Sequence, residues 1–145
     1  MFELHVNVDS LELAKSGSIW GDVWISFPEE EFPHENWNDM VIPYLAALAE
    51  CLRAVMVSGI SRQVSFYDGP YSIHVAPGRG AAILLKPEGG LVVKGVEVPS
   101  AVLVAQLVEC GDRLIAACNK RGWSANRDVR QLQDALLGIR AVLSS

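Results

Sequence analysis

The segment from residue 64 to residue 75 constrains the fold of this chain more than any other. Apolar side chains occupy every second position on both sides of a short break: Val64, Phe66, Tyr71, Ile73 and Val75. The break is Asp68-Gly69-Pro70, a sequence typical of a tight turn. Alternation with period two indicates strands with one buried face. We therefore predict two antiparallel strands that reverse at Gly69 and form the middle of a sheet covered by helices.

Further strands and three helices are predicted from the same kind of pattern. Strands are expected over 2–8, 19–27, 83–85 and 91–93. A first helix starts near Asn38 or Asp39, either of which can cap it, and ends at Gly59; two more run from 100 to 120 and from about 126 onward. Gly111 lies within the second helix, where glycine costs about 1 kcal/mol relative to alanine, so we expect a close packing contact there. The predicted fold class is α+β in two layers, a mainly antiparallel sheet of about six strands with three helices in the order ββα-ββββ-αα.

Length and composition predict a single domain over residues 1–145. Half of the residues are apolar and a fifth are charged, which is typical of a chain that buries a core. No continuous apolar run approaches the roughly 18 residues that a membrane span needs, and the N-terminus lacks the pattern of a signal peptide. Cys51, Cys110 and Cys118 all fall in helical patterns and are expected to be reduced, buried thiols. These observations predict a cytoplasmic protein without a membrane partner.

Charge is distributed unevenly along the chain. Residues 1–50 carry ten acidic residues and one lysine, a net charge of −9, whereas residues 51–145 carry seven acidic and eleven basic residues, a net charge of +4. Such a split predicts a strongly negative region of the surface. An acidic region repels phosphate, so nucleic acid is not an expected partner.

Aromatic residues are expected on the polar side of the strands. If the helices cover one face of the sheet, the other face carries Glu3, His5, Asn7, Trp20, Asp22, Trp24, Ser65, Tyr67, Ser72 and His74. Two tryptophans and a tyrosine reach the size at which an apolar patch marks an interaction site. The alternative is that the loop over 28–38 or the connection over 9–18 folds over Trp20 and Trp24.

Motifs that carry chemistry are absent. The sequence has no nucleophile elbow, and His34, Glu35 and Asp39 match no zinc spacing. We predict no catalytic residues, no metal and no cofactor, and hence no enzyme.

Two stretches resemble small cytoplasmic immunity proteins of bacterial polymorphic-toxin and contact-dependent growth inhibition systems. They are Trp37-Asn-Asp39 at the start of a helix and Phe66-Tyr-Asp-Gly-Pro-Tyr71 as a hairpin, together with the closing pattern Gly122-Trp123…Asp128…Leu132. The resemblance implies a non-enzymatic inhibitor that binds a toxin domain inside the cell. It identifies neither the toxin nor any contact residue.

Many such toxins are nucleases with basic clefts, and an acidic surface with aromatic anchors suits a basic partner. The predicted partner-binding residues are Trp20, Asp22, Trp24, Glu29, Glu30, Glu31, Glu35 and Asp39. Two alternatives remain open. A secretion chaperone would bind an effector segment along a sheet edge, and a small-molecule-binding protein would need a pocket, for which His5, Tyr67 and His74 are the candidates. The oligomeric state is not predicted.

Overall fold

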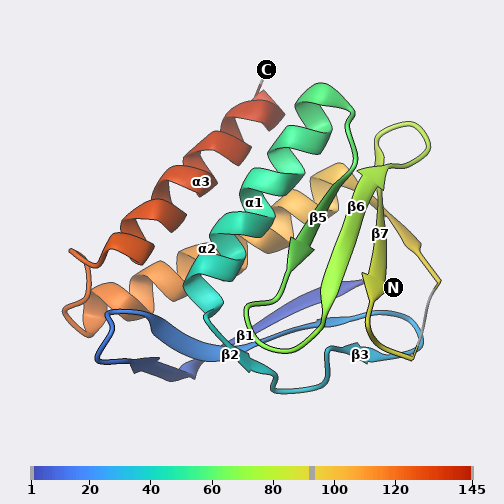
Figure 1. Cartoon of the computed structure of the whole chain (residues 1–145). Coiled ribbons are helices and arrows are strands. Elements are labelled where there is room, and N and C mark those ends of the chain that lie inside the picture. The colour runs from blue at the N-terminus through green and yellow to red at the C-terminus, as the bar shows by residue number, and fades with distance from the viewer. Residues whose placement is uncertain (1, 92–93, 145) are drawn as a thin grey trace.

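The strands of the chain form two antiparallel sheets, and three helices complete an α+β fold (Figure 1). The computed structural model describes residues 2–91 and 94–144. Sheet A contains β1 (Glu3–Leu13), β2 (Ile19–Ser26), β3 (Glu31–Phe32) and β4 (Asn38–Asp39). Sheet B contains β5 (Arg62–Ser65), β6 (Ser72–Pro77), β7 (Ala82–Glu88) and β8 (Val96–Pro99). The helices are α1 (Val41–Ser58), α2 (Ser100–Lys120) and α3 (Arg127–Ser144).

The predicted α+β class and the order of the main elements are confirmed. The strands are divided between two sheets, and two short strands are added before α1: β3 within the predicted loop and β4 at the predicted start of the helix. β2 is central in sheet A, because it pairs with β1 on one side and with β3 and β4 on the other. Sheet B is a meander in the order β5-β6-β7-β8, so β5 lies at an edge rather than in the middle. The predicted strand over 91–93 falls partly outside the described residues, and the fourth strand of the meander is β8.

The helices and both sheets enclose one apolar core. In Figure 1 β1 and β2 run along the bottom, the hairpins of sheet B stand at the right, and the helices fill the corner between them. The buried side chains include Val23 and Ile25 of sheet A, Ile73 and Val75 of sheet B, and Leu45 of α1. Alternate residues of β2 and of the first half of β1 therefore point to this core, as the period-two pattern predicts. Beyond Asn7 the register of β1 shifts, and Leu11 is the next buried residue.

Helix α1 begins later than predicted. Asn38 and Asp39 pair with Asp22 and Gly21 of β2 as the short strand β4, so neither residue caps the helix. The predicted end is confirmed, because Gly59 adopts a left-handed conformation with φ of 72° and its N–H bonds to the carbonyl of Val55 at 2.8 Å. By length and composition α1 could cross a membrane, but more than half of it is buried within the fold, as in the core helix of many globular proteins.

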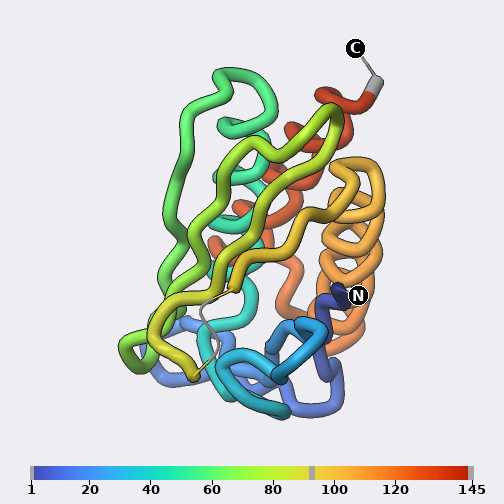
Figure 2. Tube along the Cα trace, turned by 90° about the vertical axis from the view of Figure 1, so that its right-hand side faces the viewer, coloured from blue at the N-terminus to red at the C-terminus, as the bar shows by residue number. Residues whose placement is uncertain are grey.

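Helix α2 closes the free edge of β1 (Figure 2). The side-chain amide of Gln106 accepts a hydrogen bond from the Leu4 N–H at 2.8 Å and donates one to the Phe2 carbonyl at 3.1 Å. Cys110 Sγ donates to the Leu4 carbonyl at 3.5 Å, and Arg121 Nη1 donates to the Val8 carbonyl at 3.1 Å. Side chains of the helix, and of Arg121 just after it, thus take the place of a neighbouring strand, which is one way in which proteins protect a sheet edge.

The three cysteines are buried free thiols, as the sequence predicts. Burial raises the pKa of both the Cys51 and the Cys110 thiols to about 11, above the ordinary value of 9.0. The native state therefore keeps these thiols protonated at a pH at which the unfolded chain already ionises them.

We expect the free energy of unfolding to fall as the pH rises from about 9 to about 11, because only the unfolded state loses the two protons of Cys51 and Cys110 in that window. Urea denaturation at a series of pH values measures this slope. A double variant, Cys51→Ala with Cys110→Ala, should lose less stability over the same window. Equal slopes for the two proteins would contradict the assignment.

The close packing contact predicted at Gly111 is confirmed. A Cβ atom at this position would lie 2.6 Å from Cδ1 and 3.0 Å from Cδ2 of Leu136 on α3. Leu136 is almost completely buried, so its side chain would have to shift within the packed interface of the two helices to admit a Cβ atom at position 111. Helices α2 and α3 thus approach each other where α2 lacks a side chain.

Replacing Gly111 by alanine should destabilise the protein by about 1–3 kcal/mol despite the gain in helix propensity, because the core becomes overpacked. Gly138→Ala on α3 is the matched control, since its nearest neighbour would be the Arg53 side chain at 3.4 Å. Urea denaturation should show Gly138→Ala to be neutral or slightly stabilising. A Gly111→Ala variant as stable as the Gly138→Ala variant would refute the packing argument.

Candidate functional site on the outer face of sheet A

The side of sheet A that faces away from the core carries polar and aromatic side chains. We call it the outer face; it consists of Glu3, His5 and Asn7 of β1, Trp20, Asp22, Trp24 and Ser26 of β2, Glu31 of β3 and Asn38 of β4. Along β2 buried and half-buried residues alternate without exception. Trp20 and Trp24 are both half-buried, so the 9–18 and 28–38 segments leave part of each indole accessible.

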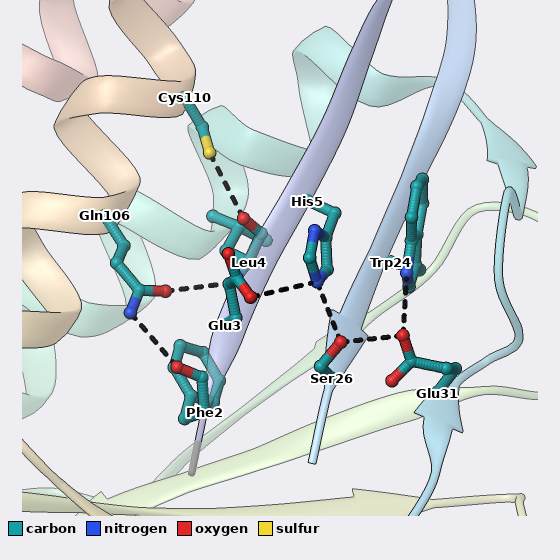
Figure 3. Close-up of polar contacts among 9 residues, drawn as sticks. All are labelled: Phe2, Glu3, Leu4, His5, Trp24, Ser26, Glu31, Gln106 and Cys110. Atoms are coloured by element: carbon teal, nitrogen blue, oxygen red, sulfur yellow. Dashed lines mark hydrogen bonds and ion pairs between the residues drawn. The ribbon is translucent and has the colours of Figure 1, made fainter.

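A chain of polar contacts holds Trp24 in place at the centre of this face (Figure 3). The His5 ring stacks on the indole, with 4.9 Å between ring centroids and 15° between the planes. The indole Nε1 donates a hydrogen bond to Glu31 Oε1 at 3.3 Å. Ser26 Oγ bonds to the same carboxylate oxygen at 2.7 Å and lies 2.8 Å from His5 Nε2. Three strands thus fix the orientation of one large aromatic side chain.

The pairing of Ser26 and His5 does not suit nucleophilic catalysis. A serine is activated when its hydroxyl donates to a neutral histidine nitrogen. Here the one hydroxyl proton of Ser26 is used in the bond to Glu31, so Oγ accepts a hydrogen bond from His5 Nε2. Glu3 approaches the same Nε2 at 3.6 Å, rather than the opposite ring nitrogen that an orienting carboxylate would engage. The hydrogen-bond directions therefore indicate a surface network.

Negative charge dominates the outer face. Glu3, Asp22 and Glu31 lie on it, and none of its nine residues is a lysine or an arginine. The side chain of Glu3 is 58% exposed, and its partner in the face is His5, which is charged only when protonated. Asp22 accepts a hydrogen bond from the Asn38 amide at 3.3 Å. Uncharged groups and His5 thus orient the carboxylates, and no lysine or arginine of this face compensates their charge.

The other predicted acidic residues lie around this face in different environments. Glu29 is exposed and Glu30 is half-buried in the turn between β2 and β3, next to Glu31. Glu35 is exposed in the loop between β3 and β4. The structure therefore brings Glu29, Glu30 and Glu31 together with the tryptophan-bearing strand.

Asp39 is not a surface residue, which corrects its prediction as a partner-binding carboxylate. It is completely buried. Oδ1 accepts hydrogen bonds from the Met40 and Tyr67 N–H groups at 2.7 and 3.2 Å, and Oδ2 accepts them from Trp37 Nε1 at 2.9 Å and the Asp68 N–H at 3.2 Å. Charge counting along the sequence missed this role, because a buried carboxylate and a solvated one look alike in composition.

The residues predicted to form a small-molecule pocket lie on separate elements, which corrects that grouping. His5 is in sheet A and His74 is in sheet B, where it pairs with Gln63 and Lys86. Tyr67 lies in the turn between β5 and β6 and is 52% exposed. Partial burial and the nearby carboxylates of Asp128, Asp39 and Glu50 raise the pKa of the Tyr67 phenol. Ser65 and Ser72 also belong to sheet B, so they do not share a face with the predicted residues of sheet A.

A cavity of about 540 Å³ lies beside His5, between β1 and α2. It is lined by Phe2–Val6 together with Gln106, Glu109, Cys110 and Arg113, and neither Tyr67 nor His74 takes part. The α2 residues were missed as site candidates, since the sequence gives no sign that this helix lies beside the first strand. In the described part of the chain, no group of three or more His, Cys, Asp or Glu side chains could hold a metal ion.

Comparison with known proteins adds no relative. No protein-family model matches the chain, and neither a curated protein nor a solved structure matches it significantly.

We expect Asp39→Ala to destabilise the protein by roughly 2–4 kcal/mol, because it leaves four part-buried N–H donors without their shared acceptor. Urea denaturation measures the change. Glu35→Ala, which removes an exposed carboxylate from the neighbouring loop, should alter stability by less than about 0.5 kcal/mol. Similar small effects of the two substitutions would show that the Asp39 network is not structural.

Proposed function

We propose that this protein binds a positively charged protein partner through the outer face of sheet A. The observation that carries the proposal is the placement of Trp20 and Trp24 on an accessible sheet face whose charged neighbours are Glu3, Asp22 and Glu31. Tryptophan is among the residues that contribute most to binding at protein interfaces. Surrounding carboxylates would speed the encounter with a basic surface and disfavour acidic ones.

The partner in this proposal is a toxin domain, and the protein acts as its cytoplasmic immunity protein. The resemblance in Trp37-Asn-Asp39 and in the hairpin Phe66–Tyr71 supports this identity. The ordered Trp24 supports it as well, since a side chain held in place before binding loses little conformational freedom in the complex. A nuclease with a basic cleft is the toxin class that best fits the acidic face.

The test begins with affinity capture of the partner from the source cells by the tagged full-length chain, followed by binding measurements with the purified partner. Trp24→Ala should weaken binding by about 30-fold or more, since it removes a central aromatic anchor. Glu31→Lys should weaken binding and flatten its dependence on salt, because it reverses a charge in the outer face. Asp134→Lys on the exposed side of α3 is the matched charge control and should leave affinity unchanged.

Two outcomes would contradict the proposal. One is an unchanged affinity of both outer-face variants for the captured partner. The other is a captured partner that does not inhibit growth when it is expressed alone. That outcome would contradict the immunity function but not the role of the outer face in binding.

A further inference from the structure

The free edge of β5 carries backbone groups without a protein partner. The Phe66 N–H donates to the Tyr71 carbonyl at 2.9 Å, so Phe66 and Tyr71 form a hydrogen-bonded pair of the β5–β6 hairpin. Such pairs alternate along an antiparallel ladder. The N–H and C=O groups of Gln63 and Ser65 therefore point away from β6, toward the edge of sheet B.

Other outward backbone groups, both further along the hairpin and at the edge of β1, do have hydrogen-bond partners. The next outward N–H on the hairpin, that of Tyr67, bonds to Asp39. At the edge of β1, side chains of α2 bond to the outward groups of Phe2 and Leu4, and Arg121, just after the helix, bonds to the Val8 carbonyl. Within residues 2–91 and 94–144, no hydrogen bond reaches the outward backbone groups of Gln63 or Ser65.

A groove of about 320 Å³ runs along this open edge, between β5 and α1, which lie side by side in Figure 1. Its lining on the helix consists of Ala47, Glu50, Cys51 and Ala54, and its lining on the strand is residues 62–65. Three of the four helix side chains are short, so they leave space beside the strand and do not reach its outward backbone groups, as Gln106 does at the edge of β1. The groove thus combines an unpaired strand edge with room for another backbone.

We propose that this groove binds an extended peptide segment of a partner protein, which adds to sheet B as a strand antiparallel to β5. An extended backbone offers a donor and an acceptor at every second residue, the spacing at which Gln63 and Ser65 present theirs. The site is separate from the outer face of sheet A and does not depend on the function proposed for that face.

Charges along the groove define which end of an antiparallel segment is basic and which is acidic. Arg62 lies at the start of β5 close to Cys51, and its positive charge acts to lower the pKa of that thiol, against the larger effect of burial. The carboxylates of Glu50 and Asp128 lie near the other end, where they act on Tyr67. Neither Arg62 nor Glu50 forms an ion pair with another described residue. An antiparallel segment therefore carries a basic residue at its N-terminal end and an acidic residue at its C-terminal end.

The experiment uses the ¹⁵N-labelled full-length chain and the blocked peptide Lys-Thr-Val-Thr-Val-Thr-Glu. At about 1 mM peptide, a concentration that detects even weak binding, the amide resonances of Gln63 and Ser65 should shift and their hydrogen exchange should slow. A second peptide of the same sequence, methylated on alternate backbone nitrogens, is the control that removes the ladder donors and should leave both amides unchanged.

Variants distinguish peptide binding in the groove from non-specific binding elsewhere on the surface. Ala54→Arg fills the groove and should lower peptide affinity by about tenfold or more, whereas Ala105→Arg on the exposed side of α2 should not change it. Glu50→Lys, at an exposed position, should weaken binding of the lysine-bearing peptide even if Ala54→Arg fails to fold. Unchanged Gln63 and Ser65 resonances, an equal response to the methylated peptide, or self-association of the chain through β5 in light scattering would each overturn the proposal.

Discussion

The buried carboxylate of Asp39 joins the parts of this structure that have to be fixed relative to one another. It sits where β4 leads into α1 and accepts hydrogen bonds from the turn between β5 and β6, nearly 30 residues further along the chain. Trp37, whose indole also donates to Asp39, packs edge-on against Tyr71 at 5.2 Å between ring centroids. One side chain therefore ties the entry of the central helix and sheet A to the hairpin of sheet B.

This connection has consequences for both proposed binding regions. β4 pairs with β2, the strand that bears Trp20 and Trp24, so the position of the outer face depends on the segment that Asp39 anchors. The same carboxylate holds the turn that follows β5, which sets the position of the open strand edge. A buried charge that accepts several backbone hydrogen bonds confers this kind of geometric specificity, because few alternative arrangements satisfy all of its partners.

The sequence alone was sufficient to predict the buried face of elements whose hydrophobic pattern repeats over several helical turns or strand pleats. The stripe Val129, Leu132, Leu136 and Ile139 is buried on α3 as its spacing predicts, whereas Leu143, which continues that spacing, is 47% exposed near the end of the helix. The alternation in β2 likewise predicted which face of the strand carries its tryptophans.

Features that depend on pairing between distant segments could not be predicted. β3 and β4 are two residues long, too short to show any period, so β3 was assigned to a loop and β4 to the start of a helix. The division into two sheets follows from which strand edges meet, a property that alternation within one strand does not record. Asp39 was misassigned for the same reason, since its partners Tyr67 and Asp68 become neighbours only in the fold.

The closing of the β1 edge by Gln106, Cys110 and Arg121 implies an order of events during synthesis. The first strand leaves the ribosome about a hundred residues before the helix that covers it, so its outward peptide groups stay open to other chains until that helix is made. A nascent chain that stalls before residue 106 presents a bare, apolar strand without its cover. Completion of α2 therefore covers a strand edge that is open to pairing with other chains until then.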